Sequence, residues 1–251
     1  MKKTIGLIFI IALGSSVINA QDHSTNPDKY FLNYGETPNS LQILPPPPSE
    51  SSARFAYDKE QYEWGKSLRN TDRGVMAIKD AELGADWVNE VFGEAFGYKI
   101  TPQTAPELCR LIENMRQDAG DLATRDAKNH YMRTRPFVYW NEPTSTPGHE
   151  GFLRTNGSYP SGHTATGWAV ALILAEINPS RATEILNRGL EFGQSRVIVG
   201  AHYQSDVDMG RIVAAGVVAT LHSNKNFAKQ LKKAKKEFKR LAKHQSQATE
   251  S

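Results

Sequence analysis

The 251-residue chain has few of the groups that cross-link a protein or anchor it in a membrane. It has one cysteine, Cys109, which excludes an intrachain disulfide. Because Cys109 falls in an amphipathic helical pattern, we expect a buried and inert thiol. Hydrophobic residues make up 39% of the chain and charged residues 23%, with a mean hydropathy of −0.51. This composition excludes several membrane spans and is typical of a globular protein with one sizeable core.

The most apolar segment near the N-terminus is too short to cross a bilayer. Lys2 and Lys3 precede an apolar run from Ile5 to Leu13, and Ala20 offers a small residue for cleavage. No stop-transfer pattern follows. These features predict a secretory signal peptide over residues 1–20 and therefore an exported protein.

Composition divides the rest of the chain into three parts. Residues 21–54 are polar and end in the prolines 45–48, so we expect an irregular strap with a polyproline segment. Between residues 55 and 224, helical patterns follow one another and the alternation of strands is missing, which predicts one all-α domain. Residues 225–251 form a basic tail.

The tail accounts for the net positive charge of the chain. Residues 225–243 hold nine Lys or Arg and one Glu, a net charge of +8, and without Lys2 and Lys3 the remainder carries −7. Apolar residues in the tail recur at spacings of three and four, which predicts an amphipathic helix. This helix would either pack on the domain or attach the protein to an anionic membrane or polymer.

Helix start and stop signals divide the central domain. Thr104 with Glu107 and a proline between them predicts the start of a long helix that reaches about Met132. An apolar run from Gly157 to Ile177 predicts a second helix capped by Ser161. A third should follow Pro179, with buried positions at Ile185, Leu186, Leu190 and Val197, and should end before Gly200. A fourth should run from about Ser205 through Ile212 and Val213 to Ala219.

Three charged or nucleophilic clusters lie at the boundaries of these helices. The first holds Lys128 and Arg135, the second Ser161, Gly162 and His163, and the third Arg196, His202 and Asp206. Taken separately, they are explained as solvated charges, a helix cap and a local hydrogen bond. Taken together, three cations, a hydroxyl and an open helix N-terminus could surround one tetrahedral oxyanion between two histidines. This chemistry suits phosphoryl transfer without a metal.

The order of these clusters resembles a known signature. The pattern K-x6-R-P, then P-S-G-H, then S-R-x5-H-x3-D resembles that of the type 2 phosphatidic acid phosphatase superfamily, which includes vanadium haloperoxidases. The stretches ILPPPP, GDLATRDAKNHYMRTRPF, GSYPSGHTATGWAVALILAEINP and SRVIVGAHYQSDVDMGR are similar to the secreted bacterial class A non-specific acid phosphatases. The resemblance covers most of residues 40–240 and implies a single bundle-like all-α domain.

The resemblance also implies a role for each residue. His202 would attack phosphorus and form a phosphohistidine, while Asp206 holds its other ring nitrogen. His163 would protonate the leaving alcohol and then activate water. The phosphoryl oxygens would be held by Lys128, Arg135, Ser161, Gly162 and Arg196. No metal or other cofactor is expected.

The chain departs from the resemblance at two positions. Relatives often carry one cysteine where this chain has Val199 and a second in the loop that here reads Thr144-Ser145-Thr146. The disulfide that would join loop and catalytic helix is therefore missing, and the loop is either more mobile or held by other contacts.

The implied function is a periplasmic acid phosphatase acting on many phosphomonoesters, with transfer to alcohols left open. Alternatives are a hydrolase of nucleoside di- and triphosphates in the same pocket, a vanadium haloperoxidase, and a non-catalytic surface-binding protein acting through its basic tail. The expected partners are small-molecule phosphate esters, with no nucleic acid and no integral membrane span. We also expect a homo-oligomer.

Overall fold

A computed structural model describes residues 29–249, and the predicted signal peptide lies outside them. Within this range the chain forms helices and loops and no strand, so the all-α prediction is confirmed. The α-helices are α1 (Ser40–Ile43), α2 (Ala53–Ser67), α3 (Asp72–Lys79), α4 (Trp87–Phe96), α5 (Pro106–Gly120), α6 (Arg125–Tyr131), α7 (Pro136–Tyr139), α8 (Glu150–Arg154), α9 (Gly162–Ile177), α10 (Ala182–Ile198), α11 (Gln204–Leu221) and α12 (Lys225–Thr249). Short 3₁₀ turns are η1 (Tyr34–Glu36), η2 (Leu122–Thr124), η3 (Pro147–His149) and η4 (Pro179–Arg181). No helix in this range is long and apolar enough to cross a membrane.

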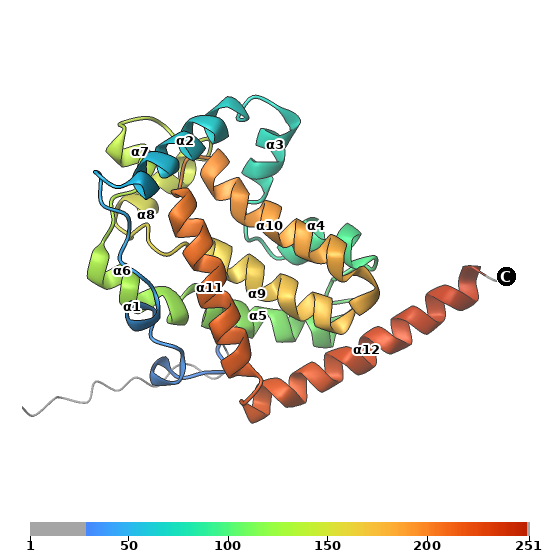
Figure 1. Cartoon of the computed structure of the whole chain (residues 1–251). Coiled ribbons are helices and arrows are strands. Elements are labelled where there is room, and N and C mark those ends of the chain that lie inside the picture. The colour runs from blue at the N-terminus through green and yellow to red at the C-terminus, as the bar shows by residue number, and fades with distance from the viewer. Residues whose placement is uncertain (1–28, 250–251) are drawn as a thin grey trace, which may run out of the picture.

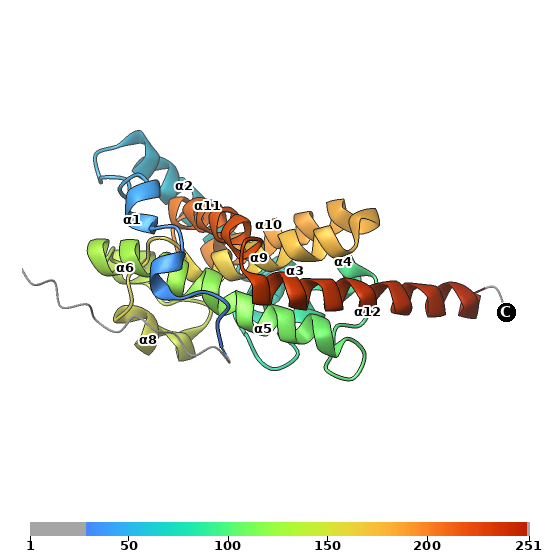
Figure 2. The same cartoon turned by 90° about the horizontal axis from the view of Figure 1, so that it is seen from below.

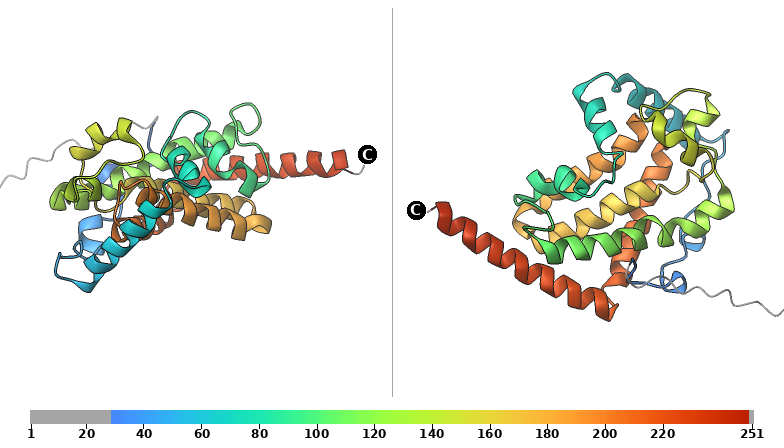
Figure 3. Two further views of the ribbon diagram at one scale, coloured as in Figure 1. Left: turned by 90° about the horizontal axis from the view of Figure 1, so that it is seen from above. Right: turned by 180° about the vertical axis from the view of Figure 1, so that it is seen from behind.

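Helix α9 is the centre of the domain. It packs against α5, α10 and α11, and from behind it is seen between α5 and α10 (Figures 1 and 3). Because it is surrounded, its sequence is apolar or small on all sides, and ten of its sixteen residues are buried. Its N-terminus, where the predicted cluster Ser161-Gly162-His163 lies, therefore meets several other helices.

Glycines allow this close approach. A Cβ on Gly162 would lie 2.5 Å from the carbonyl oxygen of Gly120 at the end of α5. A Cβ on Gly210 of α11 would lie 2.6 Å from the carbonyl oxygen of Ser161. Real side chains do not tolerate such distances, so only glycine lets α5 and α11 reach the start of α9.

The prediction of one long helix from residue 104 to about 132 is wrong in two respects. The chain leaves the helix after Gly120, passes through η2 and continues as α6. At its start Thr104 does not cap the helix; Glu237 of α12 accepts hydrogen bonds from the backbone N–H groups of Glu107 and Leu108 at 3.0 to 3.2 Å. Both differences arise from tertiary contacts, which a local pattern does not contain.

The other predicted helices occur with shifted details. Helix α9 begins where predicted, with Ser161 as its cap. Helix α10 ends before Gly200, as predicted, and Gly200 has a left-handed φ of 86°. Two predicted core positions are wrong, because Leu190 is 41% exposed and Ile212 is 49% exposed.

The described part of the N-terminal strap is held by contacts near both of its ends. The backbone N–H groups of Phe31 and Leu32 donate to the carboxylate of buried Asp118 in α5, both at 3.1 Å. Near the strap's other end, the hydroxyl of Tyr159 donates to the carbonyl of Pro45 at 2.6 Å. The segment contains η1 and α1, so it is less irregular than predicted, while prolines 45–48 are outside any helix.

Helix α12 runs beside α5 and then extends past the rest of the fold (Figures 1 and 2). Its apolar stripe is packed against the core: Phe227 and Ala234 are fully buried and Leu231 is 6% exposed. Phe238 packs against Phe96 and Tyr98 with ring centroids 5.3 and 5.2 Å apart. The apolar side of the amphipathic helix therefore packs against the domain.

Candidate active site

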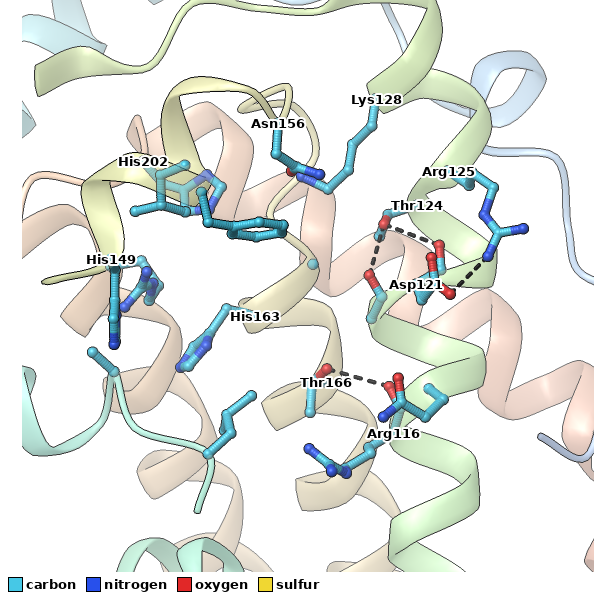
Figure 4. Close-up of a pocket in the computed structure, with 18 of the residues that line it drawn as sticks. Arg116, Asp121, Thr124, Arg125, Lys128, His149, Asn156, His163, Thr166 and His202 are labelled. Carbon is cyan, nitrogen blue, oxygen red and sulfur yellow. Dashed lines mark hydrogen bonds and ion pairs between the residues drawn. The ribbon is translucent and has the colours of Figure 1, made fainter. Parts of the chain in front are cut away.

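The three clusters come together around one cavity of about 630 Å³ (Figure 4). Its wall is formed by α5, α6, α9, α10 and the segment around α8. The sequence-predicted residues that line it are Lys128, Arg135, Gly162, His163, Arg196 and His202. Ser161 and Asp206 are not among the lining residues; both are fully buried.

His202 is held at both ring nitrogens. Its Nε2 lies 2.9 Å from Nη1 of Arg135, and its Nδ1 lies 3.3 Å from Oδ2 of Asp206. A guanidinium only donates, so Nε2 accepts and Nδ1 carries the proton that faces Asp206. Burial and the charge of Arg135 lower the pKa of His202 well below its usual value. The ring is therefore neutral, with a lone pair on Nε2.

Asp206 is ionised although it is buried. Burial alone would raise the pKa of Asp206. The charge of Arg133 and the hydrogen bonds that the carboxylate accepts lower this pKa by more than burial raises it, so it lies below the usual range. Ser158 Oγ donates to Oδ2 at 2.5 Å, and the backbone N–H of Tyr203 donates to the same oxygen at 3.0 Å. The carboxylate that orients His202 is thus itself fixed in place.

Arg133 was not singled out from the sequence, yet it links two buried carboxylates. Its Nη1 lies 2.6 Å from Oδ1 of Asp206, and its Nη2 lies 2.8 Å from Oδ2 of Asp58 in α2. Asp58 also accepts from the backbone N–H and the hydroxyl of Ser205 at 2.8 and 2.6 Å. Arg133 lies between Lys128 and Arg135 in the motif, but its partner Asp58 is 75 residues away, and no local signal reveals that contact.

All three guanidinium nitrogens of Arg135 donate to protein groups. Its Nε donates to the carbonyls of Leu153 and Asn156 at 2.9 and 3.0 Å, and its Nη1 donates to the carbonyl of Ala201 at 3.0 Å. It therefore joins the segment around α8 to the loop that holds His202. Burial and the charge of Arg196 lower its pKa to about 9, which leaves it charged at neutral pH.

Arg196 has buried N–H donors without acceptors in the described part of the chain. It is 3% exposed, and in the described part of the chain its Nε and Nη1 have no hydrogen-bond partner. Burial lowers its pKa to about 10, so the group stays charged. Buried N–H groups without acceptors are unfavourable, and an oxyanion in the cavity would satisfy them.

Lys128 reaches the cavity because the chain bends between α5 and α6. Its Nζ donates to the carbonyl of Gly157 at 2.8 Å. Burial and the nearby charges of Arg135 and Arg196 lower its pKa to about 7. Its positive charge is therefore sensitive to pH in the neutral range.

Ser161 and Gly162 form the first turn of α9. The Ser161 hydroxyl oxygen accepts from the backbone N–H and the hydroxyl of Thr164 at 3.2 and 2.9 Å. The side chain predicted to bind phosphate thus serves as the helix cap, and its own proton remains available for donation. Gly162, without a side chain, leaves the backbone open to the cavity.

His163 is held by the residue that follows α3 and by α10. Its Nε2 lies 2.7 Å from the backbone carbonyl of Asp80, which can only accept, so Nε2 carries a proton and Nδ1 is the second nitrogen. The ring stacks on Phe192 with centroids 4.5 Å apart. Burial and the charge of Arg196 lower the pKa of His163 well below its usual value.

Asp80 is a second residue that the sequence did not reveal. Its carboxylate forms an ion pair with Arg188 and accepts from the hydroxyl of Ser195 at 2.5 Å. One residue therefore ties His163 to the part of α10 that carries Arg196. Its partners lie 83 to 115 residues away in the chain, so only the fold brings them together.

The loop without cysteine is held by other contacts. The backbone N–H of Ser145 donates to the carbonyl of Val199 at 3.0 Å, which joins the same two segments that the relatives' disulfide was expected to join. Glu150 accepts from the backbone N–H and the hydroxyl of Thr144 at 2.8 and 3.1 Å.

Cys109 is half-buried, and burial raises the pKa of its thiol to about 11, which agrees with an inert group.

Within residues 29–249 no group of three or more His, Cys, Asp or Glu side chains is arranged so that it could hold a metal ion. The groups that surround the cavity are instead cations, histidines and backbone N–H donors, which suit an oxyanion.

Comparison with known proteins identifies the family. Residues 119–229 match the model of the PAP2 superfamily. The chain is 53% identical over 248 residues to a non-specific acid phosphatase of Providencia stuartii, covering 97% of this chain and 100% of the relative. It is 43% identical to one of Salmonella typhimurium, with 92% and 91% covered, and 36% identical to an acid phosphatase of Zymomonas mobilis, with 92% and 86% covered. Given these matches over nearly whole chains, the protein belongs to the PAP2 superfamily and, within it, to the non-specific acid phosphatases, a family of enzymes.

Proposed function

We propose that this protein is an acid phosphatase that hydrolyses a broad range of phosphomonoesters through a phosphohistidine on His202. The observation that carries the proposal is the pair of contacts at the His202 ring: Nε2 accepts from Arg135 at the cavity, and Nδ1 faces Asp206. A neutral imidazole with its lone pair at an anion-binding cavity is a nucleophile ready for a phosphoryl group.

In the first step, Arg135 moves its hydrogen bond from Nε2 of His202 to a phosphoryl oxygen. The freed Nε2 then forms a bond to phosphorus while the bond from phosphorus to the ester oxygen breaks. The imidazole becomes positively charged, and the ionised Asp206 stabilises it through Nδ1–H. His163 gives its proton to the departing oxygen, which leaves as an alcohol. Since Nε2 of His163 is bound to the carbonyl of Asp80, Nδ1 is the atom that delivers the proton.

In the second step, water attacks phosphorus and the bond to His202 breaks. His163, now neutral, takes a proton from that water, and inorganic phosphate and the original enzyme are regenerated. If an alcohol takes the place of water, the same step transfers the phosphoryl group, and phosphotransferase activity remains a prediction.

The cations supply the stabilisation in both steps. The transferring group spreads negative charge over its equatorial oxygens, and preorganised donors bind that charge best. Arg196 supports this role most directly, because its buried Nε and Nη1 have no partner among residues 29–249. Lys128, Arg135 and the first turn of α9 would bind the remaining oxygens.

One observation favours the second candidate, hydrolysis of nucleoside di- and triphosphates. Arg116 of α5 also lines the cavity, and its Nε is buried without a partner in the described range, although its Nη2 pairs with Glu113 at 2.6 Å. A second phosphate next to the first would find a donor there. Comparing the rates of phosphate release from AMP and ATP separates the two candidates.

The proposal is tested by measuring phosphate release from several phosphomonoesters at acidic pH. We expect turnover by the wild-type enzyme and none by His202→Ala. His222→Ala is the matched control, because His222 is exposed and lies outside the cavity. Normal turnover by the His202 variant would exclude this residue as the nucleophile. Periplasmic location and homo-oligomer formation remain predictions.

A further inference from the structure

The catalytic cavity has more room and more chemical variety than a phosphate requires. Its volume of about 630 Å³ lies in the range of pockets that enclose a whole small molecule. Besides the cations and histidines, apolar side chains line it, among them Leu83, Phe152 and Leu153. These residues have no part in the phosphoryl chemistry described above.

The chemistry of the proposed function sets where the leaving group lies. In an in-line displacement the nucleophile and the leaving oxygen are on opposite sides of phosphorus. With His202 as nucleophile, the leaving oxygen is next to His163, and the rest of the leaving group extends beyond His163, away from His202.

The region next to His163 includes the segment that carries η3 and α8. His149 in η3 and His163 both line the cavity, and Figure 4 shows the two rings on the same side of the pocket. His149 Nε2 lies 3.2 Å from Oε1 of Glu82 in the loop after α3. Phe152 follows His149 by three residues, so the two side chains share one face of this helical segment.

Phe152 is unusual in its exposure. It is 69% exposed, more than any other large hydrophobic residue in the described range, and yet it lines the cavity. Its neighbour Leu153 is 7% exposed and packs in a small core with Phe137 and Ile198. The burial of Leu153 anchors the helix, so the ring of Phe152 is displayed on a fixed support.

The support is tied to the catalytic machinery itself. Arg135 donates from Nε to the carbonyl of Leu153 at 2.9 Å, and the guanidinium of Arg154 lies over the ring of Phe137 at 4.9 Å. The position of Phe152 relative to His202 is therefore fixed by Arg135, which contacts both segments.

We propose that Phe152 is the stacking surface for an aromatic leaving group, such as a nucleotide base, at the rim of this cavity. The inference rests on the proposed function, because it takes the direction of the leaving group from His202 and His163. An exposed phenyl ring gains contact when a flat ring covers it, and aromatic pairs have attraction beyond the buried area. Sugar phosphates without a base gain nothing from Phe152.

The test compares AMP with ribose 5-phosphate, which are esters of the same type of primary alcohol and differ by the base. Steady-state rates are measured for the wild type, Phe152→Ala, Phe152→Leu and Phe152→Trp. We expect Phe152→Ala to raise KM for AMP about fivefold and to change KM for ribose 5-phosphate less than about twofold, with kcat unchanged. Phe152→Leu should raise KM for AMP as Phe152→Ala does, since leucine keeps apolar bulk but has no ring. Phe152→Trp, which keeps an aromatic ring, should keep the low KM of the wild type for AMP.

Tyr57→Ala is the matched control, because Tyr57 is an aromatic residue that is 50% exposed and lies outside the cavity. It should change neither KM. Equal effects of Phe152→Ala on both substrates, or no effect on AMP, would overturn the stacking role while the proposed phosphatase activity stands. A wild-type enzyme that hydrolyses neither substrate would overturn both.

Discussion

Nη1 of Arg135 lies 2.9 Å from Nε2 of His202, and this contact assigns the protons of the site. The guanidinium donates, so Nε2 of His202 is unprotonated and Nδ1–H is left for Asp206. Arg135 therefore does two things: it lines the cavity with positive charge, and it keeps the histidine in the tautomer that the proposed mechanism requires.

The rate should depend on pH with an acidic optimum. Rising pH removes the proton from His163, whose pKa is lowered, and then the charge of Lys128, whose pKa is about 7. Falling pH protonates His202 and removes its lone pair. We expect kcat/KM to form a bell-shaped curve with its maximum below neutral pH. A rate that keeps increasing above pH 7 would contradict these assignments.

Replacing Arg133 by methionine should damage both stability and catalysis. It leaves the buried carboxylates of Asp58 and Asp206 without their shared cation, so the free energy of unfolding should fall by about 3–5 kcal/mol. Because Asp206 then loses its fixed position behind His202, kcat should fall by about 100-fold. Urea denaturation and steady-state kinetics measure the two effects.

Lys235→Met is the control for Arg133→Met. Lys235 forms an exposed ion pair with Glu176, so its loss should lower the free energy of unfolding by less than about 1 kcal/mol. Similar losses of unfolding free energy in the two variants would mean that the buried ion pairs of Arg133 stabilise the fold no more than an exposed ion pair does.

The sequence predicted which residues meet at the cavity better than which residues hold them in place. The residues that line the cavity lie in short, ordered motifs at helix ends, so helix boundaries, charge and the family resemblance pointed to Lys128, Arg135, His163, Arg196 and His202. The residues that hold them were missed, because Asp80 and Asp58 are far away in the chain and each contact exists only after folding. The break after Gly120 was missed for the same reason, since close contact with Gly162 of α9 is not encoded locally.

Glu237 should stabilise the fold without serving catalysis. Its carboxylate, 7% exposed, accepts from the first free N–H groups of α5, at the end of that helix away from the cavity. Glu237→Gln removes the negative charge at a helix N-terminus and should lower the free energy of unfolding by about 1–2 kcal/mol, with kcat unchanged.

Glu113→Gln is the matched change for Glu237→Gln on the exposed side of the same helix. It should lower the free energy of unfolding by less than about 1 kcal/mol. A loss of kcat in Glu237→Gln at full stability would show that α12 communicates with the site. The basic tail itself is best tested by charge reversal, since its deletion would also remove the buried Phe227 and Ala234.

A chelator should leave the activity unchanged. In the proposed mechanism Lys128, Arg135 and Arg196 neutralise the transferring phosphoryl group, and His163 supplies and accepts the protons. The rate of phosphate release should therefore be the same with and without EDTA. Activity that is lost with EDTA and recovered with a divalent ion would show that a metal takes part.

The central claim is that His202 carries the phosphoryl group. The most direct measurement uses His163→Ala with a phosphate ester of a good leaving group, followed by rapid alkaline quenching and mass spectrometry of the peptides. Without His163 to activate water, the intermediate should accumulate, and a phosphoryl adduct should be found on His202. An adduct on another residue, or none while the leaving group is released in a burst, would contradict the account.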